Sequence, residues 1–123
     1  MATLNDRVFD NGLTVLDTEA NKVLITSQEA TTYTEANATY ALGNSTSLSI
    51  GAPADRSGGG REVVVASVSD GSVTGTGTAT HFALVDTSNT RLLATGSLSA
   101  SQSVTSGNTF TLASFDIGIP DPA

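Results

Sequence analysis

The chain lacks cysteine and tryptophan, and only five of its 123 residues are basic. The absence of cysteine excludes disulfide bonds, thiolate metal sites and a cysteine nucleophile. Without a disulfide, the fold must depend on a hydrophobic core, and a chain of this length is large enough to bury one. We therefore expect a single domain. A cysteine-free chain is also compatible with assembly in the cytosol.

The basic residues are scattered along the chain, while 12 acidic residues bring the formal net charge to −7. Nucleic-acid binding needs a basic patch that neutralises phosphates, so we expect no nucleic-acid partner. An acidic surface repels anionic lipid headgroups, and no apolar run approaches the roughly 20 residues that span a bilayer. Residues 1–10 also lack the basic-then-apolar order of a secretory signal. We expect a soluble protein without a membrane partner.

Charged residues are sparse, at 14% against a usual quarter, and Ser, Thr, Gly and Ala take their place. A surface of hydroxyl groups costs less to desolvate than a charged one, which favours contact with other subunits. The β-propensity of threonine explains the same bias equally well. Composition leaves both interpretations open.

Residues 3–17 carry two conflicting local signals. Leu4, Val8 and Phe9 begin an apolar series at helical spacing, after a capping-box pattern. Asn11-Gly12, in the middle of this segment, is instead typical of a two-residue β-hairpin turn. We favour a helix that is weakened or broken at Gly12.

The next segments combine a strand with a long excursion. Residues 22–27 form a short apolar run with β-branched residues, which predicts a buried strand. Residues 28–46 are rich in Ala, Thr and Asn and predict a surface loop, with one turn of helix at 34–41. Tyr33, Asn37 and Tyr40 fall at helical spacing there. Long loops of this kind often hold binding sites.

The second half of the chain reads as a meander of short strands. A flexible Gly-rich loop is expected at 57–60, with turns at Asp70-Gly71, Ser88-Asn89 and Ser106-Gly107. The last strand changes phase between Leu112 and Phe115, which predicts a bulge or bend. The expected strands are residues 48–50, 62–68, 72–76, 78–86, 91–98 and 109–119.

These patterns predict an all-β fold, a β-sandwich or jelly-roll-like antiparallel meander with a short N-terminal helix. Residues 1–20 would form the helical segment, residues 21–119 the β-sandwich and residues 120–123 a flexible tail. The whole chain would remain a single domain.

No motif in the sequence indicates catalysis. His81 is the only histidine, no Gly-x-Ser-x-Gly elbow is present, and one histidine without cysteine cannot form the usual zinc sites. Glu29, Glu35 and Glu62 could converge in space as a glycosidase pair, although no tryptophan platform accompanies them. We expect no enzyme activity, no metal and no cofactor.

Three segments of the second half carry a resemblance to a known family. They are TATHFALVD at residues 78–86, RLLATGSL at 91–98 and SVTSGNTFTL at 103–112. These segments resemble small virion structural proteins of tailed bacteriophages, a family described as head-decoration or tail-fibre-like. The turn at residues 87–90 departs from the family pattern because it lacks glycine.

The resemblance implies a non-enzymatic virion protein, and we expect a decoration (cement) protein on the capsid surface, assembled in the bacterial cytoplasm. Its partners would be the major capsid protein or other virion proteins, and copies of itself. Candidate contact residues are Leu4, Val8 and Phe9, which could equally cover one end of the sandwich. The alternative is a receptor- or glycan-binding module on a tail or fibre, for which Tyr33 and Tyr40 are the candidate residues.

Overall fold

In a computed structural model of the protein, the structure describes residues 6–120, with side chains from Asp10 onward. The described chain forms two compact units. The first comprises the residues up to Glu19, Ser49–Ser67 and the residues from Ala113 onward. The second comprises Ala20–Leu48 and Val68–Leu112. The expected division of a single domain at residues 20 and 119 stays a prediction.

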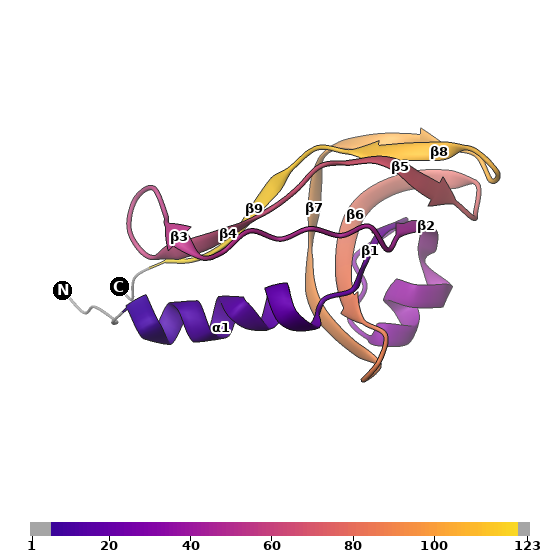
Figure 1. The fold of residues 1–123 in the computed structure, drawn as a ribbon. Helices are drawn as coiled ribbons and strands as arrows, with labels where there is room; N and C mark the ends of the chain where they lie inside the picture. Colours follow the sequence, from indigo (N-terminus) through magenta and orange to yellow (C-terminus); the bar gives the residue numbers. More distant parts are fainter. Residues whose placement is uncertain (1–5, 121–123) are drawn as a thin grey trace. The chain divides into compact units, whose positions relative to one another are not determined.

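The second unit is a curled six-stranded antiparallel sheet with the strand order β7-β6-β1-β2-β5-β8 (Figure 1). A short π-helical turn, η1 (Glu35–Thr39), precedes β2. The strands are β1 (Lys22–Thr26), β2 (Ala41–Ser45), β5 (Val68–Val73), β6 (Gly77–Asp86), β7 (Arg91–Val104) and β8 (Thr109–Leu112).

Strand β1 is the centre of this sheet, as its apolar run predicts. It pairs with β2 on one side and β6 on the other, and the side chains of Val23, Leu24 and Ile25 are all buried. Burial of consecutive side chains means that both faces of β1 are covered. On one face, Leu24 packs in a cluster with Ala36 of η1 and with Ala83 and Val85 of β6.

Two loop or turn predictions in this unit are wrong. The excursion at residues 28–46 ends in β2, which pairs with both β1 and β5. Asp70-Gly71 is not a turn but lies inside β5, which pairs with β8. A Cβ atom at position 71 would lie 2.2 Å from the Phe110 ring. Gly71 is therefore a strand residue that leaves room for this aromatic side chain.

The β6–β7 hairpin turns at Ser88-Asn89, as predicted, and a buried carboxylate organises the turn. Asp86 accepts hydrogen bonds from the backbone N–H of Ser88 at 3.0 Å and from the Asn89 side chain at 2.7 Å. Thr90 takes a φ of 52°, a conformation that glycine adopts more readily. The Asn89 side chain, the two backbone N–H groups and Arg91 hold the pKa of Asp86 below its ordinary value.

We expect Asp86→Asn to make the protein less sensitive to acid. Because the pKa of Asp86 is lower in the folded state than in the unfolded state, the ionised carboxylate stabilises the fold at pH values above the unfolded-state pKa of about 3.9. This stabilisation is lost as the pH falls through the folded-state pKa. Urea unfolding at about pH 7 and about pH 3 would measure it. The wild type should lose more free energy of unfolding between these pH values than Asp86→Asn. Asp70→Asn, which removes an exposed carboxylate from the same unit, should behave as the wild type; equal pH dependence in all three proteins would contradict the prediction.

The first unit joins one helix to a small antiparallel sheet of order β3-β4-β9. Helix α1 (Asp6–Glu19) packs against β4 (Arg61–Val65), and β4 pairs with β3 (Ala54–Asp55) and β9 (Phe115–Ile119). Arg61 on β4 forms ion pairs with Asp10 of α1 at 2.9 Å and with Asp55 of β3 at 2.6 Å.

The helix prediction is confirmed, but the break at Gly12 is wrong. Helix α1 runs without interruption through Asn11-Gly12, and Leu13 and Leu16 are buried. A glycine inside a helix costs about 1 kcal/mol, whereas burying one leucine side chain stabilises by about 2 kcal/mol. Tertiary packing therefore outweighs the local turn signal.

The phase change in the last predicted strand has a clear structural basis. Residues 109–119 form two strands that belong to different sheets, β8 in the six-stranded sheet and β9 in the small one. The predicted strand at 62–68 divides in the same way into β4 and the start of β5. Residues 48–50 form no full strand, only an isolated bridge between Ile50 and Val65.

The prediction of an all-β fold with a short N-terminal helix is confirmed. All the strand pairings in the described residues are antiparallel, although strand order in the larger sheet does not follow chain order. None of the described helices has the length and apolar character needed to cross a membrane.

Candidate functional site

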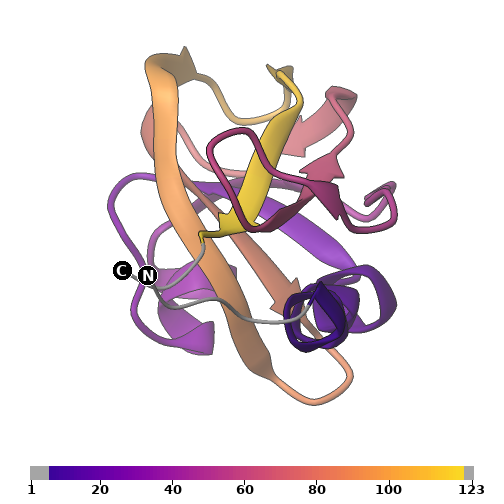
Figure 2. The ribbon, with the colours of Figure 1, turned by 90° about the vertical axis from the view of Figure 1, so that its left-hand side faces the viewer.

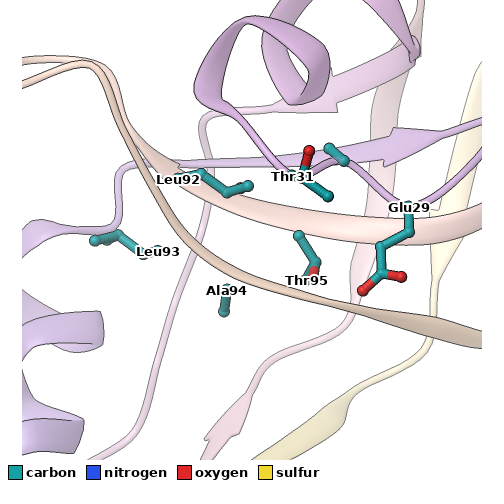
Figure 3. A pocket seen from close by; sticks show the side chains of 7 residues that line it. Glu29, Thr31, Leu92, Leu93, Ala94 and Thr95 are labelled. Atoms are coloured by element: carbon teal, nitrogen blue, oxygen red, sulfur yellow. The ribbon is translucent and has the colours of Figure 1, made fainter.

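The six-stranded unit has a shallow hollow of about 330 Å³ beside its β7 edge. Figure 3 shows its two walls: Glu29 and Thr31 come from the segment after β1, and Leu92, Ala94 and Thr95 come from the start of β7. The pairing of β1 with β6, and of β6 with β7, brings these distant segments together. The lining residues are Glu29, Ala30, Thr31, Leu92, Leu93, Ala94 and Thr95.

The hollow combines one carboxylate with hydroxyl and aliphatic groups. Glu29 can accept hydrogen bonds, Thr31 and Thr95 can donate or accept them, and Leu92 and Leu93 provide apolar surface. Its volume lies at the lower end of the range for small-molecule sites. No group of three or more His, Cys, Asp or Glu that could hold a metal ion occurs among residues 10–120.

Tyr33 and Tyr40 lie close to this region but do not form an exposed aromatic platform. Both side chains are half-buried and pack against the core cluster around Leu24, which also includes Ala30 of the hollow. The Tyr40 carbonyl accepts a hydrogen bond from the Ser27 backbone N–H at 3.0 Å. The two tyrosines therefore help to attach the 28–40 segment to the sheet.

Glu35 is held in its ionised form by its neighbours. One carboxylate oxygen accepts hydrogen bonds from the backbone N–H of Thr31 at 2.8 Å and from the Thr31 hydroxyl at 2.7 Å. These bonds, together with one from Tyr40, lower the pKa of Glu35. The negative charge of Glu35 in turn raises the pKa of Tyr40. This interaction stabilises the turn of η1.

The carboxylates considered for glycoside hydrolysis have different environments. A general acid in such a site needs a raised pKa, whereas the pKa of Glu35 is lowered. Glu62 lies on β4 in the first unit, while Glu29 and Glu35 belong to the second. The lowered pKa argues against Glu35 as the general acid of such a site.

The N-terminal candidates are described only in part. Leu4 lies outside the described residues. Val8 and Phe9 belong to α1, but their side chains are also outside the described part of the structure. Their proposed role in partner contact therefore stays a prediction.

Sequence reasoning did not identify the β7 wall of the hollow. Leu92, Leu93 and Thr95 were expected only as strand residues, and no local motif marks them. They lie opposite Glu29 and Thr31 only because β6 separates the two segments in the sheet. Strand pairing between residues far apart in sequence has no local signature.

The chain was compared with protein-family models, curated protein sequences and solved structures, and no match was found. Function must therefore be inferred from the residues and their arrangement.

Proposed function

We propose that this protein is a non-enzymatic structural protein of a tailed-bacteriophage virion, a decoration protein that binds the lattice of the major capsid protein. The observation that carries the proposal is the resemblance of residues 78–86, 91–98 and 103–112 to small virion proteins. In the fold these residues correspond to β6, β7 and the segment that leads into β8. The resemblance thus covers both edges of the six-stranded sheet.

The surface of these strands supports a role in subunit contact. Their exposed side chains are largely hydroxyl groups, and no charged residue occurs from Leu92 to Phe115. Burying such a surface costs less than burying charges, which require partners of opposite sign. The exposed hydroxyl residues on these strands include Thr78, Ser97, Ser99, Ser101, Ser103, Thr109 and Thr111.

A receptor- or glycan-binding module remains the alternative, with weaker support. That function requires aromatic side chains free to stack on a ligand. Tyr33 and Tyr40, the candidates for this role, are half-buried against the core cluster. The alternative therefore lacks an evident platform in the described residues.

Co-sedimentation of purified protein with phage heads and, separately, with isolated tails would test the proposal. We expect saturable binding to heads at a constant ratio to the major capsid protein, because a decoration protein occupies equivalent lattice sites. Binding should persist at high salt, since the proposed contact surface is uncharged.

The two negative outcomes have different meanings. Binding to tails alone would overturn the capsid assignment. Binding to host cells, without binding to heads or tails, would favour the receptor-binding alternative and direct mutagenesis to Tyr33 and Tyr40.

A further inference from the structure

The outer edge of β7 pairs with no strand of the described structure; near its end, the Gln102 side chain donates a hydrogen bond to the Thr111 carbonyl of β8 at 2.9 Å. β7 has 14 residues and lies at the end of the six-stranded sheet, so it pairs with β6 on one side only (Figure 2). Within residues 6–120, no other strand pairs with its second side. Unpaired strand edges present N–H and C=O groups that can pair with another chain.

This edge lacks the protection that edge strands of monomeric proteins usually have. Such strands commonly carry lysine, other charges or proline, which prevent edge-to-edge pairing. After Arg91, β7 contains no charged residue and no proline. The net charge of −7 comes from other parts of the chain. Two copies meeting at β7 would therefore place no charged β7 residue after Arg91 against its copy; the charge beside this contact is Glu29, which lines the hollow together with Thr95.

Two irregularities limit the part of β7 that can pair. Its register with β6 shifts between Leu84 and Val85 and again between Ala79 and His81, which leaves residue 93 without a partner and sets residues 98–101 opposite Thr80 alone. Bulges of this kind interrupt an edge. Between them, residues 94–97 pair regularly with β6. These four residues have small side chains, so another backbone can approach closely.

We propose that a second copy of this chain docks on this edge, with residues 94–97 of the two β7 strands pairing antiparallel about a two-fold axis. A two-fold contact brings the same surface of both copies together, so it requires a patch that is not strongly charged. A cationic partner would instead be attracted to the acidic parts of the molecule. We therefore expect the partner at this edge to be a second copy of the chain, which meets it through the same uncharged β7 residues.

The same geometry predicts a closed dimer and no fibre. Pairing of two β7 strands uses the long free edge of each copy. The opposite edge of the sheet is β8, which has only four residues. The bulge at 98–101 also stops the new pairing from extending along β7. Pairing of this kind needs no virion component and is a property of the purified chain.

The cysteine-free sequence allows a direct test by single-cysteine variants. In antiparallel two-fold pairing, directly opposed residues belong to the same face. The two-fold axis therefore cannot pass between two neighbouring residues, because these lie on opposite faces of the strand. Within residues 94–97 it passes through Thr95 or through Gly96. With oxidised glutathione as the oxidant, a Thr95-centred dimer should form a disulfide in Thr95→Cys alone; a Gly96-centred dimer should form one when Thr95→Cys and Ser97→Cys are mixed. Thr111→Cys, at an exposed position on β8, is the control and should not cross-link.

Molar mass measured by light scattering provides the second readout. We expect the wild type to shift from monomer to dimer between micromolar and millimolar concentrations. Ser97→Lys, which adds a charge to the edge of both copies, should abolish the dimer, and Thr111→Lys should retain it. These substitutions are at exposed positions, so circular dichroism should show an unchanged fold.

A monomer at all concentrations, equal cross-linking at Thr111→Cys, or a dimer insensitive to Ser97→Lys would each overturn the proposal. Binding of the wild type to phage heads that is lost in Ser97→Lys, without a dimer of the purified protein, would also overturn it and assign this edge to the lattice. If the protein did not bind phage heads, a cross-linked dimer of the purified chain would still support the dimer proposal. The dimer and the virion function are thus tested separately.

Discussion

Gly60→Ala is expected to lower the free energy of unfolding by about 3 kcal/mol or more. Gly60 has a φ of +91°, a region that residues with a Cβ atom rarely adopt. A Cβ atom at this position would lie 2.0 Å from the carbonyl oxygen of Ile119 and 2.8 Å from the Cα atom of Pro120. Both are backbone atoms, so the loop between β3 and β4 or the end of β9 would have to move.

Gly107→Ala is the matched control for this substitution. Gly107 has a nearly identical φ of +93°, but no atom lies within 4 Å of the position of its Cβ. Gly107→Ala should lower the free energy of unfolding by only about 1 kcal/mol, the cost of placing a residue with a Cβ atom at a positive φ. Urea unfolding followed by circular dichroism would measure both variants. Equal losses would show that the β3–β4 loop does not lie against the end of β9.

Leu24→Ala should destabilise the protein by about 3 kcal/mol, because it opens a cavity at the centre of the six-stranded sheet. Leu24 is 1% exposed and packs in the cluster with Ala36, Ala83 and Val85. Cross-strand neighbours of β1 on both sides restrict the collapse that could refill the space. The loss would be measured as the change in the free energy of unfolding in urea.

Leu93→Ala removes the same atoms from a different environment. Leu93 is half-buried, lines the hollow and occupies the extra position on the β7 edge. Its substitution should cost at most about 1 kcal/mol, since little apolar surface is lost. A loss as large as that of Leu24→Ala would mean that the core of this unit lies nearer to the β7 edge than the structure places it.

Several strands could be predicted because their signals are local. The apolar run of β1 depends only on neighbouring residues, and β1 and β6 both form where strands were expected. The turns at Ser88-Asn89 and Ser106-Gly107 also form, because their residues tolerate the required backbone angles. For Gly107 this angle is a φ of +93°.

Other predictions failed where a local signal competed with distant contacts. Asn11-Gly12 continues in a helix because Leu13 and Leu16 are buried. Asp70-Gly71 stays in a strand because the Phe110 ring occupies the space beside Gly71. In both cases a glycine that is typical of a turn serves a packing requirement instead.

The candidate residues illustrate the same limit. Tyr33 and Tyr40 could be assigned to a helical turn from their spacing, but their burial against Leu24 depends on how the sheet pairs. The hollow between Thr31 and Thr95 likewise requires β6 to lie between β1 and β7.

Composition and local pattern were enough to establish an all-β, acidic protein with one short helix, since secondary-structure preference and charge are properties of neighbouring residues. They also located the phase change near Ala113-Ser114 as a bend. Its meaning came from the fold: one continuous pattern contributes β8 to the six-stranded sheet and β9 to the small one. Strand partners, and with them the free edge of β7, depend on contacts between residues far apart in the chain, which local preferences do not encode.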